Sequence, residues 1–556
     1  MPAWLQLALA RALGAGSVAY LQLIDCPSAA TTPIRRHAFA ARLFAAWARY
    51  DRRHFTPTAN PWARCSLPGD GAGSPRGDPG ADAPLPAAFD LVIDAEGLDV
   101  ADAIAGTARR GLWQVITGGD RTGEPPFAPG RVGIVEMLEH RSITSISWME
   151  RADASASLVL LDTTSTETSR VSPTVTAVRL AWLATEMLVR LLARAALGQE
   201  RATDDRAVSI DPIPATSLDR PGSAVDPVAW TAPGERVSAS HRGGVTGFIA
   251  ARVSAWLARA FQERWFEEHW EVHYALSDEP VVALERFTAI PASADRYWAD
   301  PHVLARDGGF QVFVEEYPRA SRRGRIATFA IDRGGAIGRA RTALQTPHHL
   351  SYPFVFDHRG RTFMVPESGA TDSVELYECV AFPHRWEHRR TLLAGVYAVD
   401  ATLHHEAGRW WLFASVAANP GRHPHDELSL FSSDDLLDGT WTLHPGDAIV
   451  ADPHRARPAG ALFELAGKRC RPAQDGVGEY GYAVRLMAIE TLTPAHYGER
   501  ETLALLPDGM PGWRGIHTYT HVPGITLIDV KTRRAKWSVQ RVRRRVRRAR
   551  ERRDDP

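Results

Sequence analysis

The 556-residue sequence lacks several patterns that would place it in a common class of protein. Its four cysteines are widely separated and include no C-x-x-C pair, which argues against a zinc site or a disulfide framework and fits a reducing compartment. No apolar run approaches the ~20 residues that a membrane-spanning helix needs. The sequence also has no H-E-x-x-H or G-x-x-x-x-G-K-[ST] motif. It therefore predicts no metal site, no nucleotide-binding loop and no resident cofactor.

The N-terminus shows no pattern of a secretory signal. Residues 1–25 contain a single Arg, and their pattern predicts a helix followed by a strand at 16–25. We therefore expect a cytoplasmic protein that is peripheral at the inner membrane face at most.

Charge is balanced overall but uneven along the chain. Lys and Arg together number 65, as do Asp and Glu, yet residues 531–550 hold 11 basic residues and no acid. Val539, Val542 and Val546 recur there at helical spacing, which predicts a basic amphipathic helix. Two interpretations stay open: an anchor on an anionic membrane surface, worth ~1 kcal/mol per basic residue, or a solvated tail. We expect no specific nucleic-acid partner.

The C-terminal half contains a repeat, in which an apolar strand opened by Asp or Pro is followed by a Gly turn and a second apolar strand. The copies read YWADPHVLARDGGFQVFVEEY, LSYPFVFDHRGRTFMVPES, YAVDATLHHEAGRWWLFAS, ARPAGALFELAGKRCRPAQD and RGIHTYTHVPGITLIDV. Their turn glycines, Gly309, Gly360, Gly408, Gly467 and Gly524, are 51, 48, 59 and 57 residues apart. A strand repeat of roughly 50 residues indicates a β-propeller with one four-stranded blade per copy. The last copy is short, so we expect residues 270–276 and 286–290 to complete its blade and close the ring.

The N-terminal half alternates strand-like and helix-like segments, which predicts an α/β domain over residues 1–205. The expected strands are 16–25, 89–96, 111–118, 131–139 and 142–150, and the expected helices are 34–50 and 173–196. Residues 66–87 form a Pro/Gly-rich loop, and residues 206–247 are predicted to be a Pro/Gly/Ser-rich linker. The fold class is thus multidomain, with an α/β domain followed by an all-β, five-bladed propeller at 248–530 and a basic tail at 531–556.

The N-terminal half resembles the formyltransferase fold of methionyl-tRNA and sugar-nucleotide formyltransferases. The similar stretches are FDLVIDAEG, GLWQVITGGD and SITSISWMERADASASLVLL. That family uses an Asn, a His and an Asp in N-x-H-x-S and D-x-G stretches, which this sequence lacks. Because no imidazole is present to manage the amine proton, we expect a degenerate domain without formyl transfer.

The C-terminal half resembles the five-bladed propellers of arabinanases, β-xylosidases, levansucrases and invertases. It is more similar to the N-terminal domain of glucosamine inositolphosphorylceramide transferases, through WADPHV, YPFVFDHRGRTFMVPES, VDATLHHEAGRWWLFAS and RPAQD. In that plant family sugar transfer is assigned to a separate C-terminal glycosyltransferase domain, which is not expected in this chain. The resemblance implies a sugar, phosphosugar or glycolipid ligand and a sugar nucleotide as donor.

The resemblance to the hydrolases implies catalytic carboxylates. Their first-blade Asp is matched by Asp300 in WADPH, and their third-blade Asp by Asp400 in AVDAT. Inverting glycosidases also need an acid, with the two carboxyl groups ~6.5–9.5 Å apart. The general-acid Glu has no clear counterpart, so Glu367 in VPES is the best remaining candidate, with Glu315 and Glu316 behind it.

Further candidates for ligand binding surround the expected funnel. They are Trp298, His302, Tyr352, Arg457, Arg471, Gln474, Asp475 and His517. The Trp298 ring suits stacking on a sugar, although Trp also packs between blades. The two Arg side chains suit a phosphate or carboxylate. The amide of Gln474 cannot donate a proton to a leaving alkoxide as an acid does.

Three main interpretations of function remain. The first is a carbohydrate-active protein of envelope polysaccharide or glycolipid biosynthesis, which acts as a glycosyltransferase or with one. The second is a glycoside hydrolase that uses Asp300 and a Glu, and the third is a non-catalytic glycan-binding scaffold. Formyl transfer is the weakest alternative. The absence of a recognisable secretion signal and the basic tail favour the first.

Overall fold

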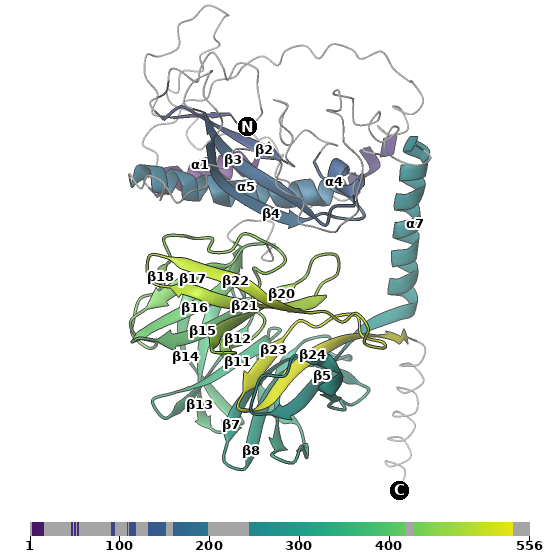
Figure 1. The fold of residues 1–556 in the computed structure, drawn as a ribbon, viewed down its shortest axis with the longest axis vertical. Helices are drawn as coiled ribbons and strands as arrows, with labels where there is room; N and C mark the ends of the chain where they lie inside the picture. The colour runs from purple at the N-terminus through teal and green to yellow at the C-terminus, as the bar shows by residue number, and fades with distance from the viewer. Residues whose placement is uncertain are drawn as a thin grey trace, which may run out of the picture. The chain divides into compact units, whose positions relative to one another are not determined.

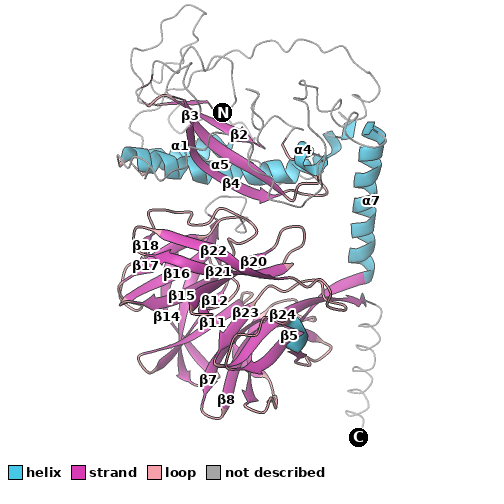
Figure 2. Cartoon of the chain, viewed as in Figure 1, coloured by secondary structure: helices cyan, strands magenta, loops and turns pink. Residues whose placement is uncertain are grey.

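The computed structural model describes residues 3–15, 91–94, 110–117, 132–138, 140–151, 159–197, 244–417 and 426–536, together with residue 108 and a few residues between 46 and 54. The chain divides into two compact units, residues 1–256 with 419–421 and residues 257–418 with 422–556. Figure 2 shows most of the described helices in the first unit and almost only strands in the second. In the described part of the chain, no helix combines the length and hydropathy of a membrane span.

The N-terminal unit is a four-stranded sheet covered by helices. The order is β1-β2-β3-β4, with β1 parallel to β2 and the other neighbours antiparallel. The strands are β1 (Val92–Asp94), β2 (Leu112–Thr117), β3 (Ile143–Arg151) and β4 (Val159–Glu167), and the helices are α1 (Ala3–Gly14), α4 (Ile134–Leu138) and α5 (Pro173–Ala196). The Ser172 side chain caps α5 by accepting from the Val175 N–H. Trp148 and Trp182 lie in the core between the sheet, α1 and α5.

Several predictions for this half are confirmed, and one is wrong. The strands expected around 92–94, 112–117 and 143–151 form, and the helix predicted at 173–196 is α5. The strand predicted at 131–139 is instead helix α4, because Ile134 and Met137 are buried at helical spacing and the Met137 N–H binds the Gly133 carbonyl. The predicted strand at 16–25, the loop at 66–87, most of the helix at 34–50 and most of the linker lie outside the described residues.

The second unit contains five four-stranded sheets, four of which follow the chain order. The first comprises β7 (Arg296–Arg306), β8 (Gly309–Pro318), β9 (Arg325–Asp332) and β10 (Arg341–Leu344). The second comprises β11 (Ser351–His358), β12 (Arg361–Glu367), β13 (Ser373–Ala381) and β14 (Arg385–Ala394). The third comprises β15 (Tyr397–Glu406), β16 (Arg409–Ala417), β17 (Ser429–Ser433) and β18 (Thr442–Leu443). The fourth comprises β19 (Phe463–Leu465), β20 (Lys468–Asp475), β21 (Ala483–Leu492) and β22 (Tyr497–Leu505).

The fifth sheet joins the two ends of this unit, as predicted. Its order is β23-β24-β5-β6, and its strands are β23 (Tyr519–Val522), β24 (Gly524–Ala535), β5 (Phe266–Ser277) and β6 (Thr288–Ala289). β24 and β5 pair without interruption from Gly524 opposite Ser277 to Ala535 opposite Phe266. The short helix η1 (Leu284–Arg286) precedes β6, and helix α7 (Gly244–Trp265) runs directly into β5 (Figure 1). This pairing leaves no open edge between the first and last sheets.

Hydrogen bonds between sheets arrange the five innermost strands as a ring. The Tyr352 N–H of β11 donates to Asp300 of β7, and the Asp400 N–H of β15 donates to Glu367 of β12. Gln474 of β20 donates to Asp400, and the Tyr519 N–H of β23 donates to the Ala459 carbonyl that precedes β19. The hydroxyl of Thr520 donates to the carbonyl of Pro301 in β7, and this hydrogen bond closes the ring. This is the blade order and closure of a five-bladed β-propeller.

The hairpin turns explain three of the predicted glycines. Gly360, Gly408 and Gly467 have φ values of 73°, 77° and 72°, and each follows a residue that also has positive φ. Two successive positive φ values define the type I′ turn that suits a tight hairpin. In the first blade the positive φ of 85° belongs to Gly308 instead, and Gly309 begins β8.

Two predicted boundaries are corrected. Helix α7 begins at Gly244, inside the stretch predicted as a linker to residue 247. β24 continues to Ala535, and Lys531 is 1% exposed, contacting Glu268 and Glu479. The first residues of the predicted basic tail are therefore part of the closing sheet, because their side chains pair with acids on neighbouring segments.

Candidate functional site

The innermost strands of the first three blades, β7, β11 and β15, each contain the same backbone irregularity. Asp300, Tyr352 and Asp400 have φ values of 50°, 41° and 52°, and each lies at a register shift in the pairing with the second strand of its blade. Positive φ is uncommon for residues other than Gly and is retained where surrounding contacts fix it. The bulges therefore place these three side chains at equivalent positions in consecutive blades.

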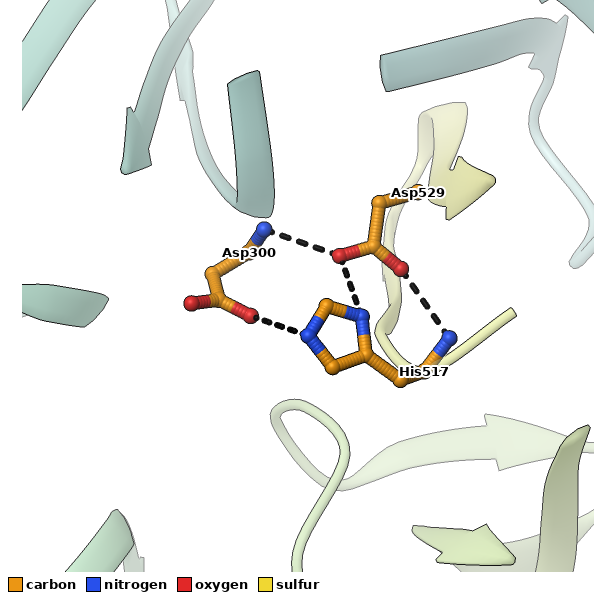
Figure 3. Close-up of side chains that lie close together, drawn as sticks. All are labelled: Asp300, His517 and Asp529. Carbon is orange, nitrogen blue, oxygen red and sulfur yellow. Dashed lines mark hydrogen bonds and ion pairs between the residues drawn. The ribbon is translucent and has the colours of Figure 1, made fainter. Parts of the chain in front are cut away.

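Asp300 is held by groups from the second and fifth blades. Its N–H donates to Asp529 at 2.9 Å, and its carboxylate accepts the Tyr352 N–H at 3.1 Å and the Thr518 hydroxyl at 3.2 Å. The His517 ring lies between the two acids, with Nε2 3.2 Å from Asp300 Oδ1 and Nδ1 2.6 Å from Asp529 Oδ2 (Figure 3). First and last repeats thus meet in one Asp–His–Asp arrangement.

Burial and charge set the protonation of this arrangement. Burial, opposed by His517 and assisted by Asp529 and Asp400, raises the pKa of Asp300 to about 6. Burial lowers the pKa of His517, but the adjacent Asp529 and Asp300 outweigh burial and raise it above its usual value. Burial likewise raises the pKa of Asp529, but His517 outweighs it and the net shift is downward. The two buried acids therefore favour the charged form of His517.

Asp400 has a different partner. Its Oδ2 accepts from Arg457 Nε and from Gln474 Nε2, the latter at 2.8 Å. Its N–H donates to Glu367 Oε2 at 3.1 Å, and Arg457 Nη2 is 3.9 Å from that same oxygen. Burial lowers the pKa of Arg457, but Asp400, Tyr480 and Glu367 outweigh it and raise the pKa well above its usual value. A permanent cation therefore holds this side of the site.

Two glutamates complete the group. Burial, with the charges of Asp300 and Glu367, raises the pKa of Glu315 well above the usual value. Burial and Asp400 likewise raise the pKa of Glu367, in spite of Arg457. Glu315 and Glu367 are equivalent, since they pair opposite Ala299 and Ser351 at the ends of β8 and β12. We call Asp300, Glu315, Glu367, Asp400 and Asp529, with Arg457, Gln474 and His517, the carboxyl cluster.

An aromatic side chain lies at the edge of the carboxyl cluster. The Tyr480 side chain is 44% exposed, and its ring centroid is 5.6 Å from that of His517 and 5.3 Å from the Arg457 guanidinium carbon. Trp270 packs on His517 at 4.0 Å between centroids. An exposed ring beside buried polar groups is a common arrangement for holding a sugar.

The structure brings together some predicted site residues and separates others. Asp300, Asp400, Glu367, Arg457, Gln474 and His517 lie in the carboxyl cluster, with Tyr352 bound through its N–H. His302 lies beside it, 3.4 Å from the Asp300 carbonyl, and burial lowers its pKa to about 4.

Trp298, Arg471 and Asp475 are engaged elsewhere. The Trp298 ring stacks on Phe329 at 5.0 Å between centroids and is 7% exposed. Arg471 is fully buried against Glu499. Asp475 pairs with His454 and Arg485. These contacts are packing and ion pairs within the blades, so none of the three is part of the carboxyl cluster.

Sequence reasoning missed Asp529, Tyr480 and Trp270 and ranked Glu315 below Glu367. The alignment of EEY in the first repeat with PES in the second matches Glu316 with Glu367 and so misses Glu315, because the turn of the first blade lies at Gly308 instead of Gly309. No signal in the sequence indicated Asp529, because the last repeat gains its third strand from residues about 250 positions earlier.

The ligand atoms of Asp300, His517 and Asp529 all lie within 4.8 Å of one another, a separation that a metal ion could bridge. Both ring nitrogens of His517 already contact a carboxylate oxygen, so its charged form could supply the positive charge there. A cavity of about 450 Å³ lies away from the cluster, beside Glu406, Trp411 and Arg469 at the turns of the third and fourth blades.

Comparison with known proteins confirms the resemblance of the C-terminal half. Residues 270–522 match the family model described as glucosamine inositolphosphorylceramide transferase 1, N-terminal. The transferase of that name from Arabidopsis thaliana is 30% identical over 248 residues, which are 43% of this chain and 32% of the relative. The one from Oryza sativa subsp. japonica is 31% identical over 230 residues, 40% and 30% of the two chains. The chain thus spans about a third of these relatives.

Solved structures with some likeness include glycoside hydrolases. The catalytic domain of the GH62 α-L-arabinofuranosidase of Coprinopsis cinerea gives a TM-score of 0.33 at 12% identity, covering 47% of this chain and 97% of that one. The GH43_1 enzyme of Xanthomonas citri complexed with xylose gives 0.34 at 12% identity, covering 44% and 89%. Because both scores are below 0.5, the fold assignment rests on the strand pairing above. The formyltransferase-like interpretation of residues 1–205 stays a prediction.

Proposed function

We propose that the propeller is the sugar-recognition part of a glycosyltransferase system of glycolipid biosynthesis, and that the sugar binds at the carboxyl cluster. The observation that carries this proposal is the convergence of buried carboxyl groups, an Arg and a His from all five blades. Sugar hydroxyls both donate and accept hydrogen bonds, so ionised and protonated acids side by side suit them. The exposed Tyr480 ring offers an apolar face for the sugar's C–H groups.

The charge of the carboxyl cluster bears on the kind of sugar. It contains five carboxyl groups but only two cationic side chains, Arg457 and His517. Arg457 is already engaged by Asp400 and lies near Glu367, which leaves little positive potential for a phosphate. An amino sugar carries an ammonium group, and its positive charge would favour the ionised forms of Glu315 and Glu367. The name of the plant relatives includes glucosamine, which agrees with this choice over a phosphosugar.

We propose that another part of the glycosyltransferase system transfers the sugar, and that the carboxyl cluster only binds it. The relatives are transferases by name, and this chain spans about a third of them. A sugar nucleotide is the proposed donor, and a lipid-linked phosphoinositol is the proposed acceptor. The third interpretation, a glycan-binding scaffold, corresponds to the same binding site without any associated transfer.

Calorimetric titration of the full chain tests the proposal, with glucosamine, a glucosamine phosphate, a sugar nucleotide and a short-chain inositolphosphorylceramide as ligands. The informative variant is Glu367→Gln, since Gln still accepts the Asp400 N–H but cannot ionise. The matched control is Glu387→Gln, on an exposed acid that pairs with Arg385. We expect wild type and control to bind glucosamine with proton release, because the ammonium lowers the raised pKa values, and Glu367→Gln to bind more weakly.

Stabilisation by a saturating ligand checks the same point independently. A ligand at 100 times its Kd adds about 2.7 kcal/mol to the free energy of unfolding. Absence of binding by every sugar in the panel would refute the proposal, and tighter binding of the phosphosugar would refute the amino-sugar assignment.

Glycoside hydrolysis is the second candidate function, and the raised pKa values favour it. Protonated Glu315 or Glu367 could act as general acid, while Asp300, with its pKa of about 6, is ionised at neutral pH and could act as base. Aryl xylosides and arabinofuranosides are suitable substrates. Turnover lost in both Asp300→Asn and Glu367→Gln but kept in Glu387→Gln would support hydrolysis, and no turnover by wild type would exclude these substrates.

A further inference from the structure

Glu315 is the acid of the carboxyl cluster that has no cationic side chain in contact with it in the described part of the chain. Each of the other four acids lies within 3.9 Å of a nitrogen of His517 or Arg457. Among the described residues, the ion-pair partner of Glu315 is His349, whose Nε2 is 3.4 Å from Glu315 Oε1. Burial raises the pKa of Glu315, and the charges of the other four acids raise it further.

His349 is held as a neutral ring. The Gly324 N–H donates to His349 Nδ1 at 2.9 Å, so the ring proton is on Nε2, the nitrogen that faces Glu315. A charged ring would place a second proton against that N–H, and burial also lowers the pKa of His349. His349 therefore presents an N–H to Glu315 but no charge, in contrast to Arg457 beside the equivalent Glu367.

Two tyrosine rings lie next to this pair. Tyr297 and Tyr317 are paired across β7 and β8, and their rings stack at 4.8 Å between centroids. The Tyr317 ring centroid is 6.1 Å from that of His349. Glu315 and Tyr317 share a face of β8, because they are two residues apart in a strand. After burial, the charge of Glu315 is the largest cause of the raised pKa of Tyr297. Aromatic rings beside a carboxyl group suit an ammonium ion.

The Glu315 carboxyl group is accessible to a ligand. Its side chain is 10% exposed, and its Oε2 has no hydrogen-bond partner among the described residues. Gly324 permits the close approach of His349, because a Cβ there would lie 2.7 Å from both Glu315 Oε1 and His349 Cε1. One oxygen of Glu315 thus contacts a neutral ring, and the other is left for the ligand.

We propose that Glu315 is the residue that binds the ammonium group of an amino sugar, with the rings of Tyr297 and Tyr317 beside it. This assignment rests on the proposed sugar function and names the part of the carboxyl cluster that recognises the amine. The ammonium would have the role at Glu315 that Arg457 has at Glu367. Glu315 would release its proton to the solvent as the ammonium binds, so that carboxylate and ligand balance each other's charge.

A divalent metal ion suits Glu315 less well than an ammonium group. Such an ion needs several converging ligand atoms. In the described part of the chain, the group of side chains with that spacing is Asp300, His517 and Asp529, and it does not include Glu315.

Calorimetric titration of the full chain with glucosamine and with glucose tests the assignment, because the two sugars differ by an ammonium and a hydroxyl group. The variant is Glu315→Gln, which has a similar size but cannot ionise. The matched control is Glu378→Gln, on a partly buried acid that pairs with Arg361. Thermal unfolding verifies that both variants fold. We expect Glu315→Gln to bind glucosamine at least about tenfold more weakly than wild type and glucose equally well. The control should bind both sugars like wild type.

The outcomes separate this assignment from the sugar function itself. If wild type prefers glucosamine to glucose and Glu315→Gln keeps that preference, the assignment to Glu315 is overturned while the sugar function stands. Equal affinity of wild type for the two sugars would also overturn the assignment.

Methylammonium chloride decides the case in which no sugar binds. At equal ionic strength it should raise the midpoint of thermal unfolding of wild type more than potassium chloride does, because a ligand of the folded state stabilises it. The difference should vanish in Glu315→Gln and persist in Glu378→Gln. That result without any sugar binding would refute the sugar function and support an ammonium site at Glu315. No effect of methylammonium on wild type, together with no sugar binding, would overturn both.

Discussion

The first and third blades place an Asp at the same position and pair it with different cations. Asp300 and Asp400 share the positive φ, the register shift and deep burial. Asp300 contacts His517, which can lose its proton, whereas Asp400 contacts Arg457, which cannot. The same backbone irregularity thus places one Asp against a cation that can titrate and the other against a cation that cannot.

This difference assigns separate tasks to the two sides of the carboxyl cluster. The pKa of Asp300 is about 6, so its charge changes with that of its surroundings near neutrality. Arg457 keeps its charge and positions Asp400 and Glu367 at every accessible pH. We expect the Arg457 side to contribute more to stability, and His517 to make its own contribution depend on pH.

Loss of the permanent cation should have the largest effect. Arg457→Met leaves Asp400 and Glu367 buried without their cation, and removal of one partner of a buried pair typically lowers the free energy of unfolding by about 3–5 kcal/mol. Urea unfolding measures the change. In Arg457→Met/Asp400→Asn most of the loss should be recovered, because the acid in direct contact with Arg457 is then replaced by a neutral side chain.

Arg471→Met is the matched control for ligand binding. Arg471 is also fully buried against an acid, Glu499, but lies outside the carboxyl cluster. Its loss should destabilise the propeller by a similar amount while leaving the sugar affinity of the folded protein unchanged. A loss below about 1 kcal/mol in Arg457→Met would contradict the proposed division of tasks.

His517→Gln should have a smaller effect that depends on pH. The folded pKa of His517 is raised, so its stabilisation is fully present below the unfolded value of 6.5 and disappears as pH rises through the folded value. We expect a loss of about 1.5–3 kcal/mol near pH 6.5, as for hydrogen bonds to charged groups. The deficit should shrink in alkaline solution. Urea unfolding across this range measures it, and a deficit that stays constant with pH would show that His517 acts by packing on Trp270 alone.

The sequence was sufficient for the repeat and for its closure, since both follow from local patterns. Alternating apolar residues and turn glycines marked the strands, and the short last repeat indicated that residues 270–276 must pair with it. The helix α4 was missed because a five-residue segment after Gly133 has too few residues to distinguish a strand from a helix by periodicity.

The directions in which the side chains point could not be predicted from the sequence. Gln474 and Asp475 are neighbours in β20 and were both proposed as ligands, but successive strand residues point to opposite faces. Gln474 faces Asp400, whereas Asp475 faces His454 and Arg485. Which of the two faces the funnel depends on the register with the next blade, and no local pattern in one chain encodes that register.

The smallest effect should come from the second blade, where the same bulge carries Tyr352. Its N–H binds Asp300, and its hydroxyl lies 2.8 Å from the Thr402 hydroxyl, which in turn donates to the Asp400 carbonyl. Tyr352→Phe removes only the side-chain contact, so we expect a loss of about 1 kcal/mol in urea unfolding. The backbone contact to Asp300 persists, so the pH dependence should match that of wild type. A shifted pH profile in Tyr352→Phe would mean that this hydroxyl connects the Arg457 side to Asp300, and that the two sides do not act separately.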